Sequence, residues 1–94
     1  MKIGDLKAGM RDIVIKGKVV GKLPVKNVNT INGPAKVAKV IIEDESGIIL
    51  LNLWNEDIEK VHIGDYLSIK KAYVIKYRGQ LQLNVSRRGK IEIL

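Results

Sequence analysis

One stretch, residues 44–54 (DESGIILLNLW), constrains the fold of this chain more than any other. It opens with a turn signal at residues 44–47 and continues as an almost unbroken apolar run that ends at the only tryptophan, Trp54. At the two-residue period of a β-strand, one face of this run suits a core and carries Ile49, Leu51 and Leu53. The opposite face carries Ile48, Leu50, Asn52 and Trp54. A half-buried strand normally turns polar residues outward, so an outward tryptophan is either covered by another element or held out for a flat ligand.

Alternating apolar residues predict four further strands, separated by turn signals. Their expected ranges are 11–23, 35–43, 66–77, and a last strand that begins at Gln80 and finishes within 90–94. Arg78-Gly79 is expected to form the tight turn of a hairpin. Residues 24–34 contain both prolines and an Asn-Gly pair, which predicts a loop.

A short helix is expected between the third and fourth predicted strands. Asn55 can cap it, and Ile58 and Val61 would form its buried side. Five strands with one short helix in that place are the layout of an OB-fold, a small Greek-key barrel. Periodicity alone also permits an SH3-like barrel, and the position of the helix favours the OB-fold. With 94 residues and no repeat or linker, the sequence predicts one all-β domain over residues 1–94.

The charge of the chain is unevenly distributed. Residues 1–41 hold nine lysines and arginines against two acids, residues 42–66 hold one against seven, and residues 67–94 hold seven against one. Two basic segments around an acidic one predict a surface that is positive on one side, which is the footprint of a polyanion binder. No apolar run approaches the roughly 20 residues of a membrane span, and the start lacks the apolar segment of a signal peptide. We therefore expect a cytoplasmic location and no membrane contact.

Catalysis, metal binding and cofactors are not expected. The sequence has no cysteine, which excludes disulfides and thiolate metal sites. The single histidine, His62, lies in an apolar Val-His-Ile run where a structural role is the simpler interpretation. The acids fall in a turn and at a helix start, without a paired partner for acid–base chemistry. No phosphate-loop or dinucleotide glycine pattern is present.

The four aromatic residues are informative because the chain has no phenylalanine. Tyr66 begins a strand and is interpreted as structural. Trp54 ends the third predicted strand, while Tyr73 and Tyr77 share one face of the fourth strand near its hairpin. In an OB-fold these two places border one groove. Three rings along a groove can each stack an unpaired base, at about 1–3 kcal/mol per base, which predicts a single-stranded nucleic acid as ligand.

Basic and amide side chains are expected beside these rings. Phosphate contacts need only positive charge within reach, and the main candidates are Lys26, Lys36, Lys39 and Arg78, with Lys16, Lys18 and Lys76 in the same cluster. Three amides are candidates for hydrogen bonds to base edges or sugar: Asn52, Gln80 and Gln82.

Several motifs in order resemble a known family. They are Ile-Gly-Asp-Leu-Lys-Ala-Gly-Met (3–10), Asp-Glu-Ser-Gly (44–47), Leu-Asn-Leu-Trp (51–54), Ile-Gly-Asp (63–65) and Ala-Tyr-Val-Ile-Lys-Tyr-Arg-Gly-Gln-Leu-Gln-Leu (72–83). Together they resemble the single-OB-fold single-stranded DNA-binding proteins of archaea, relatives of the human single-stranded DNA-binding proteins and of replication protein A domains. The resemblance implies base stacking on Trp54, Tyr73 and Tyr77 and a basic contact at Lys26. It also implies a protein that coats single-stranded DNA in replication, recombination and repair.

Two other functions remain open on the sequence. One is RNA binding, as in the anticodon-binding OB domains of aminoacyl-tRNA synthetases, because no residue recognisably reads a 2′-hydroxyl. The other is a protein-interaction subunit of a larger assembly, which would use the apparently outward Ile48 and Leu50.

Overall fold

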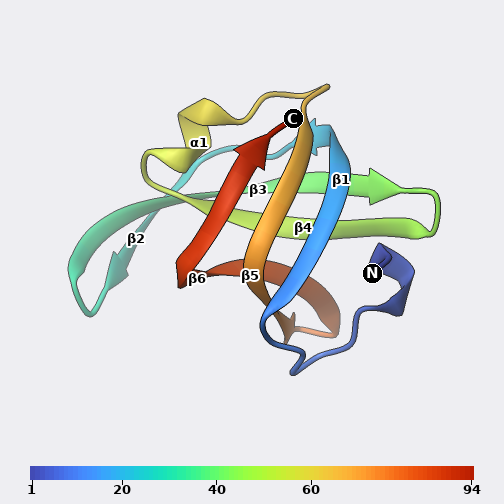
Figure 1. The fold of residues 1–94 in the computed structure, drawn as a ribbon. Coiled ribbons are helices and arrows are strands. Elements are labelled where there is room, and N and C mark those ends of the chain that lie inside the picture. Colours follow the sequence, from blue (N-terminus) through green and yellow to red (C-terminus); the bar gives the residue numbers. More distant parts are fainter.

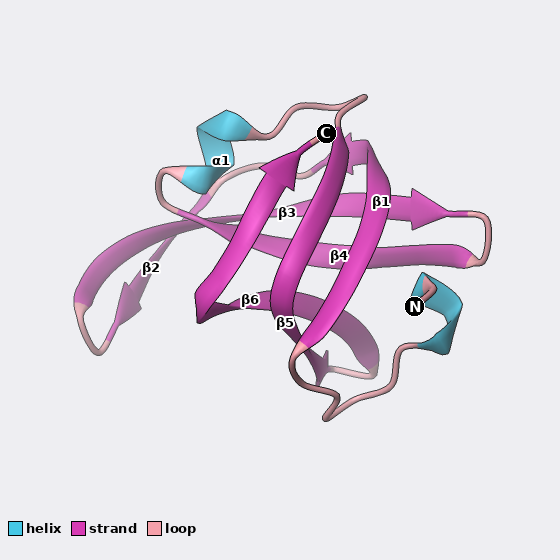
Figure 2. Ribbon diagram, in the orientation of Figure 1, coloured by secondary structure: helices cyan, strands magenta, loops and turns pink.

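The computed structural model describes residues 1–94, and strands make up most of the chain (Figures 1 and 2). In chain order the elements are a 3-10 turn η1 (Ile3–Asp5), β1 (Ile13–Lys22), β2 (Lys26–Thr30), β3 (Gly33–Asp44), β4 (Gly47–Trp54), α1 (Asp57–Lys60), β5 (Tyr66–Tyr77) and β6 (Gln80–Ile93). Neither helical segment is long and apolar enough to cross a membrane.

The strands close into a barrel. The sheet order is β1-β5-β6-β4-β3-β2, and a further pairing of β1 with β3 closes the ring. Only β4 and β6 pair in parallel; the other neighbours are antiparallel. In Figure 1, β1, β5 and the end of β6 cross β3 and β4 steeply, with α1 at one end of the barrel. The predicted five-stranded OB barrel with a helix between its third and fourth strands is therefore confirmed, since β2 pairs with β3 alone.

The predicted loop over residues 24–34 was wrong. Residues 26–30 form β2, which pairs with the start of β3 from Lys26↔Val37 to Thr30↔Gly33. The turn is stabilised by the Thr30 hydroxyl, which donates to the Gly33 carbonyl (2.7 Å) and accepts from the Asn32 N–H (3.2 Å). Figure 1 shows this hairpin as a curved ribbon that projects from the barrel. Its residues are exposed or half-buried on both faces, so they lack the alternation that marks a strand.

The barrel interior is built from alternating strand residues. On β1, burial alternates as predicted, with Ile13, Ile15, Gly17 and Val19 inward. On β4 the inward residues are Ile49, Leu51 and Leu53, again as predicted. The sequence of β3 does not alternate cleanly, so it did not show which residues of that strand face the core. In the structure the inward residues of β3 are Ala38, Val40 and Ile42. Apart from Gly17, these residues belong to one core of 18 buried residues, which fixes the outward face of each strand.

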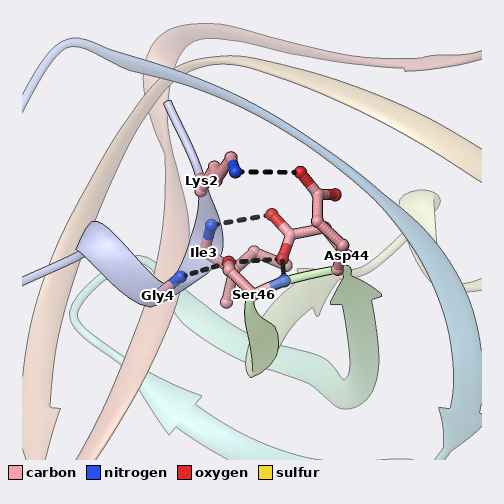
Figure 3. Close-up of polar contacts among 6 residues, drawn as sticks. Lys2, Ile3, Gly4, Asp44 and Ser46 are labelled. Atoms are coloured by element: carbon pink, nitrogen blue, oxygen red, sulfur yellow. Dashed lines mark hydrogen bonds and ion pairs between the residues drawn. The ribbon is translucent and has the colours of Figure 1, made fainter.

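The N-terminal turn η1 is fastened to the β3–β4 turn (Figure 3). The Ile3 N–H donates to Asp44 Oδ2 at 2.8 Å, and the Gly4 N–H donates to Ser46 Oγ at 2.7 Å. The Ser46 N–H donates to Asp44 Oδ1 at 2.7 Å, so one carboxylate accepts from both segments. Desolvation acts to raise the pKa of Asp44, but hydrogen bonds from the Ile3 N–H and from Ser46 outweigh it and lower that pKa.

The short helix α1 is fixed by contacts that differ from the predicted cap. Asn55 does not cap it: its side-chain oxygen accepts from the Lys36 N–H at 3.0 Å, and the helix begins after Glu56 without a side-chain cap. Asn55 instead ties the end of β4 to β3. At the other end, Lys22 Nζ donates to the carbonyls of Ile58 (2.6 Å) and Val61 (3.0 Å). The predicted buried side, Ile58 and Val61, is confirmed.

Candidate nucleic-acid interface

Three aromatic residues share one outward face of the barrel, and the strand register shows why. Leu53 points inward, so its neighbours Asn52 and Trp54 point outward. Asn52 Nδ2 donates to Gln82 Oε1 at 3.1 Å, which puts Gln82 on the same side. Along β6, Gln80 and Asn84 alternate onto the side of Gln82, and each is paired directly with a tyrosine of β5: Gln80↔Tyr77 and Asn84↔Tyr73. We call this outward surface of β3, β4, β6 and the second half of β5 the aromatic face.

The rings of the aromatic face remain partly open to solvent. Trp54 is 40% exposed and Tyr77 is 54% exposed, while Tyr73 is half-buried. The indole stands on β4 and the two phenols on β5, with β6 between them. Each ring therefore has area available for stacking, and the three are spread across three adjacent strands rather than along one.

The space between the rings is occupied by amides, most of which are buried. Asn52, Gln82 and Asn84 are 7%, 4% and 7% exposed. Asn84 was not among the predicted site residues. Gln80 lies beside Tyr77 and is exposed. The Asn52–Gln82 hydrogen bond satisfies one end of the Asn52 amide, whereas its buried Oδ1 has no partner.

Three predicted cations lie on or beside the aromatic face. Lys26 is paired with Val37, which is paired with Trp54, so the lysine lies on the tryptophan side of the ribbon. Lys39 is paired with Asn52 and is half-buried. Arg78 sits in the β5–β6 turn, with its guanidinium carbon 5.3 Å from the centre of the Tyr77 ring. The ion pairs of the protein involve Lys2, His62, Lys70 and Lys90, so no carboxylate competes for these three cations.

The structure places other predicted cations elsewhere. Lys36 is paired with Asn27 and alternates with Val37, so it lies on the opposite side of the ribbon from Lys26. There it lines a hollow of about 600 Å³ together with Glu56 and Glu59. Lys16 and Lys18 line another hollow beside residues 43–45, which are all acidic. Lys76 is adjacent to Tyr77 on β5, so its side chain points away from the aromatic face.

One basic residue near the rings was missed. Arg11 lines a hollow of about 360 Å³ with Asp12, Tyr73 and Ser86. It precedes the first strand, and only the pairing of Ile13 with Ala72 brings it next to Tyr73. The sequence around Arg11 has no pattern that could have indicated this position.

A closed barrel of this topology, with partly exposed rings and unpaired cations on one face, has the features of an OB-fold nucleic-acid-binding module. The family described as "Single-stranded DNA binding protein Ssb-like, OB fold" matches residues 6–93, and the chain belongs to this family. The resemblance drawn from the sequence motifs is thereby confirmed.

Individual relatives agree with the family. The single-stranded DNA binding protein Ssb of Saccharolobus solfataricus is 29% identical over 90 residues, which cover 96% of this chain and 61% of that protein. The chain thus spans less than two thirds of that relative's length. The solved OB domain of a Thermoplasma acidophilum protein has a TM-score of 0.86 at 23% identity, covering 100% of this chain and 85% of that one. The solved replication factor A related protein of Methanobacterium thermoautotrophicum has a TM-score of 0.82 at 26% identity, covering 100% and 89%.

Proposed function

We propose that this chain coats single-stranded DNA in the cytoplasm, with little sequence preference, during replication, recombination and repair. Its role is binding rather than catalysis. The observation that carries the proposal is the placement of Trp54, Tyr73 and Tyr77 on one face, each with ring area open to solvent. Membership of the Ssb-like family supports the choice of ligand.

The proposed mechanism combines stacking with phosphate contacts. Stacking on an aromatic ring requires a base with a free face, so duplex DNA is excluded and any base sequence is accepted. Lys26, Lys39 and Arg78 hold the backbone, because their charges have no carboxylate partner. With about three phosphates neutralised, the slope of log K against log salt is expected near −2 for a single strand. The expected site covers roughly 4–16 nucleotides.

Replacement of the tryptophan tests the stacking. Trp54→Ala removes one stacking surface worth about 1–3 kcal/mol, so affinity for labelled oligo-dT should fall about 5- to 150-fold. The fold should persist, because the ring is 40% exposed and lies outside the core. Tyr66→Ala is the matched control: Tyr66 is 55% exposed but begins β5, seven residues before Tyr73.

Fluorescence anisotropy at one salt concentration gives the affinities, and circular dichroism checks the fold. A folded Trp54→Ala protein that binds oligo-dT as tightly as the wild type would remove the stacking mechanism. Competition by an RNA oligomer of matched length and sequence tests the RNA alternative in the same assay.

A further inference from the structure

A hollow opens where the two parallel strands of the barrel begin. β4 and β6 are paired only at Leu50↔Gln82 and Leu51↔Leu83. Next to the first of these pairs lies a hollow of about 240 Å³, which we call the Ile48 slot. Six of its seven lining residues are apolar, and the seventh is Gln80. Ile48 and Leu50 line it from β4, Leu81 from β6 and Ile3 from η1.

The Ile48 slot opens at the edge of the aromatic face: Ile3, Ile49 and Leu81 line it from the core side, and the other four lining residues face outward. Ile48 and Leu50 alternate with inward Ile49 and Leu51, so they point to the same side as Asn52 and Trp54. Gln80, at the other wall of the slot, is the direct partner of Tyr77. A nucleotide stacked on Tyr77 would therefore lie next to one wall of the slot.

The residues of the slot do not suit a surface left in water. Ile48 is 63% exposed, and its cross-strand partner on β3 is the exposed Glu43. A solvent-facing strand position next to a glutamate would ordinarily carry a polar residue. An apolar hollow with a single convergent polar group is the usual composition of a small-ligand pocket. A nucleobase has apolar faces and a hydrogen-bonding edge, which match the aliphatic walls and the Gln80 amide.

The cation beside Tyr77 supports the same occupant. Arg78 lies over the Tyr77 ring and has no carboxylate partner. A phosphate held by this guanidinium joins the nucleotide on Tyr77 to the next one along the strand. We propose that the Ile48 slot takes up the base of that neighbouring nucleotide, flanked by aliphatic side chains rather than stacked on a ring, with its edge bonded to Gln80. This inference rests on the proposed function and adds a fourth base site to the three rings.

An abasic scan combined with one substitution tests the slot. The probe is the shortest oligo-dT that binds with full affinity, so that its register is fixed, with one abasic position moved along it. In the wild type, four positions should lose affinity when abasic. In Ile48→Thr, affinity for the intact oligomer should fall about fourfold or more, since each buried CH₂ contributes about 0.8 kcal/mol. The abasic penalty at one of the four positions should then shrink by the same factor, while the other three penalties stay unchanged.

A matched control separates the slot from general effects. Ile63→Thr makes the same change at an isoleucine that is 64% exposed and lies between α1 and β5. This variant should keep all four abasic penalties. Only three penalised positions in the wild type, or four penalties of unchanged size in Ile48→Thr, would overturn the slot while leaving the stacking mechanism intact. Three positions would leave the slot open for an apolar side chain of a protein partner. Failure of the proposed function would show differently, as absent binding or as an unaffected Trp54→Ala.

Discussion

The buried amides beneath the rings make a quantitative prediction about stability. Asn52 and Gln82 are 7% and 4% exposed and share a single hydrogen bond of 3.1 Å. Asn52 Oδ1 is buried without a partner. A typical hydrogen bond contributes about 1 kcal/mol to the free energy of unfolding, whereas an unsatisfied buried polar atom costs about 1–3 kcal/mol. The pair therefore lowers the stability of the barrel relative to apolar side chains of the same size.

The double variant Asn52→Leu/Gln82→Met removes both the hydrogen bond and the unsatisfied oxygen. Taking about 1 kcal/mol for the lost bond and about 2 kcal/mol for the relieved oxygen, we expect a gain of about 1 kcal/mol. For a domain of this size that is an increase in Tm of roughly 4–8 °C. The single variant Asn52→Leu should change Tm little, because relief of one oxygen is offset by leaving Gln82 Oε1 without its donor.

Thermal unfolding followed by circular dichroism measures the three proteins, with reversibility checked by a second scan. The single variant serves as the internal control, since it separates removal of the pair from removal of one member. If the double variant melted at or below the wild-type temperature, the claim that these amides reduce stability would be refuted. The affinity of the same proteins for oligo-dT would show whether the amides that reduce the stability of the fold contribute to ligand binding.

Two further predictions follow from the charges. Lys39→Ala should reduce the steepness of the salt dependence of oligo-dT binding by about 0.7, because Lys39 is paired with Asn52 on the aromatic face. Lys36→Ala should leave that slope unchanged, because Lys36 lies on the other side of the ribbon beside Glu56 and Glu59; equal slopes for the two variants would contradict the assignment of faces. Asp44 has a pKa lowered below 3.8 in the folded protein, so its stabilising effect is present above 3.8 and is lost as pH falls through the lowered value. The Tm of Asp44→Asn should therefore fall less than that of the wild type when the pH is lowered from 4 to more acidic conditions. Parallel pH profiles for Asp44→Asn and the wild type would disprove this origin.

The barrel strands could be predicted because their buried faces alternate with a period of two. The hairpin of β2 could not, because a ribbon exposed on both sides is stabilised by backbone pairing and leaves no apolar pattern. The role of Asn55 was also misjudged. An asparagine before a helix normally caps it, but here Asn55 has a positive φ of 49° and its side-chain oxygen accepts from the Lys36 N–H.

The aromatic residues of the candidate site could be picked out from the sequence, whereas the positions of the lysines and amides around them were harder to predict. Trp54, Tyr73 and Tyr77 are prominent because aromatic residues are few in this chain. The separation of Lys36 from Lys26 depends on the register of a ribbon whose existence the sequence did not reveal. The burial of Asn52 and Gln82 depends on β4 and β6 meeting in parallel, 30 residues apart in the chain. Contacts of this kind are set by barrel closure rather than by local pattern.

The parallel seam has a consequence for how the barrel opens and closes. The hairpins β3–β4 and β5–β6 form between neighbouring segments, whereas β4 meets β6 through only two paired positions of distant sequence. Such non-local pairing carries a larger loop-closure entropy than either hairpin, so this joint forms after the hairpins and parts before them. Trp54 stands on one side of the joint, and Tyr73 and Tyr77 stand on the other. A ligand that spans these rings would therefore hold together the shortest pairing of the barrel and slow its opening.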